Sequence, residues 1–211
     1  MGHASRLPEV RGWQEAGLTV PSVAVNVSSV EFAAPRFIEG VFDILNETGL
    51  PPSALELELN EGALMKRADA TQAILDALAA SGVQMSVDDF GTGYSSLNSL
   101  RRFPIHMLKV DQSFVREISL KKGEASVVAA VLSMAQTLSL KVIAEGVETA
   151  EELAFLQQHQ CDQAQGYYFS RPLPADEFSQ LVRRGLVSSM ARRRYAQPFG
   201  RLHNHALDTP H

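Results

Sequence analysis

The sequence predicts an α/β fold of the TIM-type (β/α) barrel, with about six of the usual eight strands present. Short segments rich in β-branched or alternating apolar residues recur along the 211 residues, and stretches with helical periodicity separate them. Most of these units approach the ~30 residues of a βαβ repeat, which favours parallel strands covered by helices. A polar side chain lies near the carboxyl end of each predicted strand, where barrel enzymes carry their functional groups.

Six strands are predicted, and helix-period stretches separate and follow them. The predicted strands are residues 23–28, 55–59, 85–90, 107–111, 141–147 and 163–169. The predicted helices are residues 30–48, 62–81, 95–103, 124–138, 150–159 and 175–184, with a further helix at residues 6–16 ahead of the first strand. We expect one domain over residues 1–187 and a disordered tail over residues 188–211, because the tail has no periodic apolar residues.

Two arrangements of such units are open at this point, a doubly wound sheet and a βα barrel. A dinucleotide-binding doubly wound domain carries a glycine-rich phosphate turn directly after its first strand. The first predicted strand is instead followed by Ser29, Val30 and Glu31, and the next glycine is Gly40. The sequence therefore favours the barrel.

The composition is that of a globular protein and excludes several other classes. The single cysteine excludes an internal disulfide, and no Cys/His cluster has zinc-ligand spacing. Nineteen Lys and Arg residues against 24 Asp and Glu residues give a formal net charge of −5, so we expect no duplex nucleic acid as a partner. The longest nearly apolar stretch, residues 127–135, is far shorter than the ~20 residues of a membrane helix, and we expect a cytoplasmic protein without a membrane segment or leader.

Acidic and apolar side chains face opposite sides of the predicted strands. In residues 55–59 the three leucines share one face, and Glu56 and Glu58 share the other. Polar side chains recur in the same way near the ends of the other strands, at Asn26, Asp88, Lys109, Glu145 and Gln165. Buried carboxylates are costly unless cations neutralise them, so this repetition predicts a metal site at the carboxyl rim.

The predicted metal ligands are Asn26, Glu58, Asp88, Asp89 and Glu145. Their oxygen atoms suit Mg²⁺ or Mn²⁺. The adjacent Asp88 and Asp89 suit two ions ~3.5–4 Å apart, an arrangement that supports phosphoryl transfer. We expect Lys109 to orient the attacking water or to offset developing negative charge, and Gln165 to hydrogen-bond the substrate or a metal-bound water.

Each of these residues also has a purely structural interpretation. Asp88 and Asp89, which precede a Phe-Gly-Thr-Gly segment, are compatible with a turn that caps a helix. Glu58 is compatible with the solvated face of an edge strand, and Lys109 with an ordinary ion pair to Asp111. Their coincidence on the same faces of successive strand ends is what favours the metal site.

Six ordered motifs resemble one known family. They are residues 26–28 (NVS), 58–61 (ELNE), 88–97 (DDFGTGYSSL), 108–114 (LKVDQSF), 144–149 (AEGVET) and 165–172 (QGYYFSRP). In order and spacing they are similar to those of the EAL-domain cyclic di-GMP phosphodiesterases, and the resemblance covers roughly residues 13–182.

The resemblance implies a modified TIM barrel that hydrolyses cyclic di-GMP to linear pGpG with two Mg²⁺ or Mn²⁺ ions. It implies metal ligation by the five residues named above. It also implies catalytic roles for Glu145, for Lys109 at the attacking water, for Gln165 beside the metals, and for Glu61 as the anchor of the loop over residues 91–96. That loop links substrate binding to dimerisation in the family, so we expect a homodimer or other self-association. Asn60 replaces the usual threonine of the second motif, a change expected to matter little.

The Glu-Ala-Leu strand that names the family is not among the 25 residues before Asn26. The sequence is therefore expected to begin inside the domain, to lack one metal ligand and two strands, and to have impaired activity. A catalytically inactive cyclic di-GMP-binding or protein-interaction module is the alternative. A third alternative is a truncated domain without activity of its own, in which exposed strand edges lead to self-association.

Overall fold

A computed structural model describes residues 12–13, 17, 22–65, 68–91, 100–120 and 125–183. Within these ranges six parallel strands form one sheet in the order β1-β2-β3-β4-β5-β6. The strands are β1 (Val23–Val27), β2 (Leu55–Asn60), β3 (Gln84–Phe90), β4 (Met107–Val110), β5 (Lys141–Ala144) and β6 (Gln163–Ala164). All six predicted strands are confirmed, although β5 and β6 end earlier than expected.

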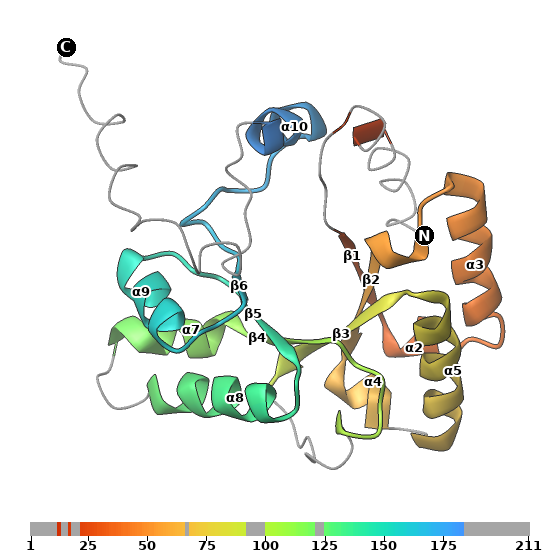
Figure 1. Cartoon of the computed structure of the whole chain (residues 1–211), viewed down its shortest axis with the longest axis horizontal. Coiled ribbons are helices and arrows are strands. Elements are labelled where there is room, and N and C mark those ends of the chain that lie inside the picture. The colour runs from red at the N-terminus through yellow and green to blue at the C-terminus, as the bar shows by residue number, and fades with distance from the viewer. Residues whose placement is uncertain are drawn as a thin grey trace.

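The helices lie around the outside of the curved sheet (Figure 1). They are α2 (Ser29–Phe32), α3 (Phe37–Thr48), α4 (Glu61–Met65), α5 (Ala68–Ser81), α7 (Gln112–Leu120), α8 (Ala125–Thr137), α9 (Ala150–Gln158) and α10 (Ala175–Arg183), with a 3-10 turn at Pro52–Ala54. Figure 1 shows α3 and α5 beside the first strands, α7, α8 and α9 beside the later ones, and α10 at the top.

The strand order distinguishes the two arrangements that the sequence left open. In a doubly wound sheet the order reverses at a switch point, and helices cover both faces. Here every strand pairs with its neighbours in the sequence, and the sheet order never reverses. Successive parallel strands are joined by right-handed crossovers, so the helices between the strands lie on one face of the sheet. The sheet therefore curves around its other face, as in a βα barrel. The predicted barrel-type α/β fold with six strands is confirmed.

The apolar core lies between the sheet and the helices. Leu55, Leu57 and Leu59 of β2 are all at most 3% exposed and belong to this core. Glu56 and Glu58, on the opposite face of the same strand, are also buried, with 8% and 7% exposed. β2 is therefore an interior strand buried on both faces, and the solvated edge strand considered for Glu58 is wrong.

Two predicted helices are each divided in the structure. The stretch at residues 30–48 forms α2 and α3, because Pro35 between them has no N–H to donate and disfavours helical backbone before it. The stretch at residues 62–81 forms α4 and α5. The sequence analysis missed α7, although the spacing of its apolar residues Phe114, Val115 and Ile118 puts them on one helix face toward the core.

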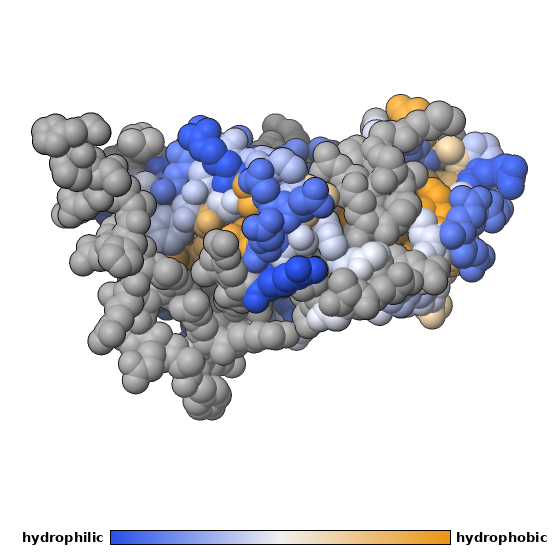
Figure 2. All heavy atoms as spheres, turned by 90° about the horizontal axis from the view of Figure 1, so that it is seen from above, coloured by the Kyte–Doolittle hydropathy of each residue, from blue (hydrophilic) through white to orange (hydrophobic). Residues whose placement is uncertain are grey.

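Several predictions concern residues outside the described part of the chain. These are most of the helix at residues 6–16, most of the stretch at residues 95–103, and the tail at residues 188–211. Trp13 is helical, as predicted, and its ring centroid lies 5.0 Å from that of Phe178 in α10. Viewed from above, hydrophilic side chains gather in the middle of the face, where Figure 1 places α10, with apolar side chains beside them (Figure 2). None of the described helices is long and apolar enough to cross a membrane.

His106 joins β3 to the start of β4. Its Nδ1 accepts a hydrogen bond from the backbone N–H of Met85 at 3.3 Å, and its own backbone N–H donates to Met85 O at 2.9 Å. Partial burial, together with the charge of Lys141, lowers the pKa of His106 below its usual value. The folded state therefore favours the neutral imidazole.

We expect the contribution of His106 to the free energy of unfolding to decrease as the pH falls from about 7.5 to about 5, because His106 is protonated more readily in the unfolded chain. His106→Asn keeps a hydrogen-bond acceptor that does not titrate, so this variant should lose less stability over the same range. Urea denaturation of both proteins at each pH measures the difference. Equal pH dependence of the two proteins would contradict the assignment.

Candidate active site

Four polar side chains, three from β2, β3 and β4 and one directly after β5, meet at the carboxyl rim of the sheet. Lys109 of β4 lies at their centre, with Nζ 2.7 Å from Glu58 Oε1 and 2.6 Å from Glu145 Oε1. Asp88 Oδ1 of β3 is 3.5 Å from the same Nζ. Because the strands are parallel, their carboxyl ends reach the same edge, and the predicted convergence of these side chains is seen in the structure. We call these four residues the Lys109 cluster.

Burial governs the charges of the cluster. It raises the pKa of Glu58 and of Glu145, and the hydrogen bond and the charge of Lys109 oppose this rise without cancelling it. Burial alone would lower the pKa of Lys109, but hydrogen bonds to Glu145 and Glu58 and their charges raise it well above its usual value. Lys109 is therefore a permanent cation, and three carboxylates facing one ammonium leave negative charge in excess.

Asp111 does not form the ion pair with Lys109 that the sequence left open. Its carboxylate accepts hydrogen bonds from the backbone N–H and the hydroxyl of Ser113, which lower its pKa. The ion pairs of Lys109 are with the three cluster carboxylates instead. The structural alternative of a Lys109–Asp111 pair is therefore wrong.

A local break in β3 brings Asp89 to the same region as Asp88. Neighbouring residues of a regular strand face opposite sides of the sheet. Asp89 has a left-handed backbone with φ 54°, and the pairing of β3 with β4 shifts register between Val87 and Phe90. Burial and then the charge of the neighbouring Asp88 raise the pKa of Asp89.

Gln165 and Asn26 lie on either side of the cluster. Gln165 follows β6, and its Nε2 donates a hydrogen bond of 2.6 Å to Glu145 Oε1. Asn26 is the register partner of Glu58 on β1, but its side chain is exposed. No hydrogen bond or ion pair within the described ranges joins Asn26 to the cluster. The structure thus brings Gln165 into the predicted site by a hydrogen bond and places Asn26 beside Glu58 without one.

Glu61 begins α4 at the end of β2. Its side chain is only 6% exposed, and among the described residues its Oε2 has no hydrogen-bond partner. The loop that it was predicted to anchor lies outside the described residues from 92 onward. The preceding Asn60 accepts a hydrogen bond of 2.9 Å from the backbone N–H of Gly62 at the start of α4, and the small effect expected of this replacement stays a prediction.

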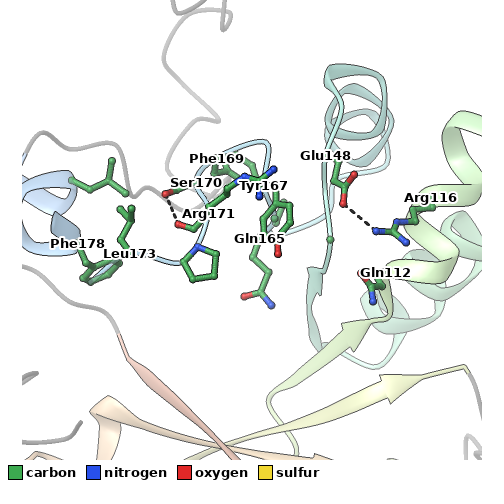
Figure 3. A pocket seen from close by; sticks show the side chains of 15 residues that line it. Gln112, Arg116, Glu148, Gln165, Tyr167, Phe169, Ser170, Arg171, Leu173 and Phe178 are labelled. Carbon is green, nitrogen blue, oxygen red and sulfur yellow. Dashed lines mark hydrogen bonds and ion pairs between the residues drawn. The ribbon is translucent and has the colours of Figure 1, made fainter. Parts of the chain in front are cut away.

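A cavity of about 650 Å³ adjoins the cluster at Gln165. Arg116 of α7 and Glu148 line it and form an ion pair of 3.1 Å, and Arg171 lies 5.0 Å above the ring of Tyr167 (Figure 3). The sequence analysis missed Arg116, whose spacing of four residues from Gln112, another lining residue, puts both on one helix face. The four-residue spacing indicates a shared face only once residues 112–120 are known to form a helix.

A family model described as the EAL domain matches residues 4–172. The chain belongs to the EAL domain family. It is 43% identical over 175 residues to the cyclic di-GMP phosphodiesterase NbdA of Pseudomonas aeruginosa, covering 83% of this chain and 22% of that protein. It is 38% identical over 178 residues to the cyclic di-GMP phosphodiesterase PdeR of Escherichia coli, covering 84% of this chain and 27% of that protein. The chain thus spans about a quarter of the length of these relatives.

Solved EAL structures share the fold. The PaMucR phosphodiesterase in complex with c-di-GMP superposes with a TM-score of 0.79 at 39% identity, covering 83% of this chain and 71% of that one. The EAL domain of Mycobacterium smegmatis DcpA gives a TM-score of 0.82 at 35% identity, covering 88% and 83%. The family resemblance predicted from the six motifs is confirmed.

The donor atoms of this EAL domain suit a hard divalent cation, since they are carboxylate oxygens with negative charge in excess. Within the described ranges, however, no group of three or more His, Cys, Asp or Glu side chains is arranged as it stands to hold a metal ion. The distances give the reason, because three carboxylate oxygens converge on Lys109 Nζ. The residues therefore fit the predicted ions in chemistry, and the two-ion site stays a prediction.

Gly166 holds Gln165 beside Glu145. The backbone N–H of Val147 donates to Gln165 O at 3.0 Å, and Tyr168 N–H donates to Val147 O at 2.9 Å. A Cβ at Gly166 would overlap the backbone N and O of Val147. Only glycine lets the chain cross so close to the end of β5.

We expect Gly166→Ala to lower the free energy of unfolding by about 1–3 kcal/mol, because the added methyl group forces these backbones apart. Gly40→Ala is the matched control. Gly40 lies inside α3 with nothing within 4 Å of an added Cβ, so this change should raise stability by about 0.5–1 kcal/mol. Chemical denaturation of the wild type and the two variants measures both changes in the free energy of unfolding. A Gly166→Ala variant as stable as the wild type would show that the backbones at Gly166 and Val147 are not tightly packed.

Proposed function

We propose that this EAL domain hydrolyses cyclic di-GMP to linear pGpG in bacterial second-messenger signalling, with two Mg²⁺ or Mn²⁺ ions. The observation that carries the proposal is the Lys109 cluster, a group with excess negative charge at the carboxyl rim of a βα barrel, in which Lys109 and Glu58 are buried and Asp88 and Glu145 are partly exposed. Family membership supports it, because the relatives NbdA and PdeR are named as cyclic di-GMP phosphodiesterases.

The residues that would hold the ions are Asn26, Glu58, Asp88, Asp89 and Glu145. Ions bound there supply Lewis acidity, which lowers the pKa of a water and stabilises charge on the phosphate. Lys109 is a permanent cation beside these carboxylates and would orient the attacking water or offset charge on the phosphate. Gln165 would fix Glu145 through its hydrogen bond of 2.6 Å. Glu61 would order the loop that follows β3.

The adjoining cavity supports a nucleotide as the substrate. Tyr167 and Phe169 offer aromatic rings on which a base can stack, and Arg116 and Arg171 offer guanidinium groups that suit phosphate oxygens. Gln165 lines this cavity and also contacts the cluster, so a ligand in the cavity would reach the proposed catalytic groups.

One observation favours a second candidate, a cyclic di-GMP-binding or interaction module without turnover. Lys109 already occupies the centre of the carboxylates, and the described residues hold no preformed metal-binding group. A domain that never displaced Lys109 would keep the nucleotide cavity and would not hydrolyse its ligand. The presence of Lys109, Gln165 and the predicted carboxylate ligands Glu58, Asp88, Asp89 and Glu145 argues for the enzyme.

We expect the purified chain to convert cyclic di-GMP to its linear product slowly, and only with Mn²⁺ or Mg²⁺, because an entering ion must displace Lys109. Glu145→Gln should lower the rate on the order of a hundredfold or more. Glu151→Gln, at an exposed position of α9, is the matched control and should match the wild type. Chromatographic separation of the nucleotides measures product. Nucleotide binding by calorimetry without any product would favour the binding module instead.

We also propose that the domain acts in the cytoplasm, where the buried thiol of Cys161 stays reduced, and that it self-associates. Within the described ranges β1 and β6 each pair with one neighbour only, and such strand edges tend to be covered by other chains.

Light scattering over a range of protein concentrations should show a dimer or larger species. A mass equal to that of one 23.0 kDa chain at every concentration would contradict self-association.

A further inference from the structure

Lys109 lies inside the carboxylate cluster and not at its edge. Its Nζ contacts Glu145 at 2.6 Å and Glu58 at 2.7 Å, and Asp88 lies 3.5 Å away. The Lys109 side chain is only 6% exposed, so water can replace little of this neutralisation. One ammonium therefore holds together three carboxylates that come from three different parts of the sheet.

The oxygen atoms around Lys109 belong to three of the predicted metal ligands. A hard divalent ion binds carboxylate oxygens at about 2.0–2.2 Å and needs their lone pairs. An ion that entered among these oxygens would lie within a few ångströms of Nζ, where two cations repel each other strongly in a buried site. The ammonium and a divalent ion therefore compete for Glu58 and Glu145.

We propose that Lys109 is a built-in competitor of the divalent ions, which partly neutralises the cluster in the metal-free domain and gives up its contacts with Glu58 and Glu145 when ions enter. In this role Lys109 is a positioning residue that sets the metal affinity, separate from any contact with the attacking water. The inference rests on the divalent site of the proposed function.

The competition has two consequences of opposite sign. Without the ammonium, the metal-free domain retains three carboxylates that repel one another in a buried place, so it loses stability. The same domain then binds divalent ions without first breaking two ion pairs, so its affinity for metal rises. A lysine that only supported the bound metal would show the reverse effect on affinity.

The test compares Lys109→Met with the wild type by calorimetric titration with MnCl₂ and by thermal melting in EDTA. Methionine keeps most of the apolar stem and removes the charge. We expect the Kd for Mn²⁺ to fall at least about tenfold, and the Tm in EDTA to fall by several degrees and to recover with Mn²⁺. Lys141→Met, an exposed position at the start of β5, is the matched control and should behave like the wild type. Equal or weaker Mn²⁺ binding by Lys109→Met overturns the inference.

A measurement on the wild type covers the case in which Lys109→Met does not fold. Lysine acetylation followed by mass spectrometry should show that Lys109 reacts several times faster with Mn²⁺ than in EDTA, because its amine loses its carboxylate partners. Lys141 should react equally in both conditions. An unchanged or slower reaction of Lys109 overturns the inference.

The outcomes separate this inference from the proposed function. If the wild type binds Mn²⁺ and the variant does not bind it more tightly, only the competitor role fails. If neither protein binds Mn²⁺, the divalent site of the proposed function fails as well. If the variant alone binds Mn²⁺, the competitor role is supported in its strongest form.

Discussion

Three carboxylates can lie together at the end of this sheet, largely shielded from water, because one ammonium lies between them. Each acidic group comes from a different strand, and each would be costly to bury alone. Lys109 of β4 reaches Glu58 on one side and Glu145 on the other, so the charges of β2, β4 and the end of β5 are satisfied as one unit. The functional rim and the stability of the barrel interior therefore depend on the same contacts.

Much of this rim could be predicted from strand periodicity. Side chains alternate along a strand, and parallel strands end at one edge, so Glu58, Asp88 and Lys109 were expected on one face and the structure places them there. The interior position of β2 could not be predicted in this way. Its alternating leucines and glutamates are equally compatible with a half-exposed strand, and only the neighbouring strands on both sides decide the burial of Glu56 and Glu58.

Other features depend on tertiary structure that no local pattern carries. The nine-residue α7 is short, and its helical period becomes informative about Arg116 only once the cavity beside it is known. Asn26 shares the strand-end pattern with Glu58, yet the structure leaves its side chain exposed at the open edge of the sheet. A shared pattern thus predicts the edge at which a side chain lies, but not the atoms that it contacts.

Because the backbone of Asp89 is left-handed, replacements there differ in whether they change the side-chain charge alone or the backbone conformation as well. Asparagine tolerates such a backbone nearly as well as aspartate, whereas alanine and β-branched residues do so at a cost. An asparagine there would remove the charge and tolerate the backbone, while an alanine would also strain the left-handed backbone. Two replacements that look equally conservative in a sequence would therefore report on different properties of the protein, and only the amide isolates the carboxylate.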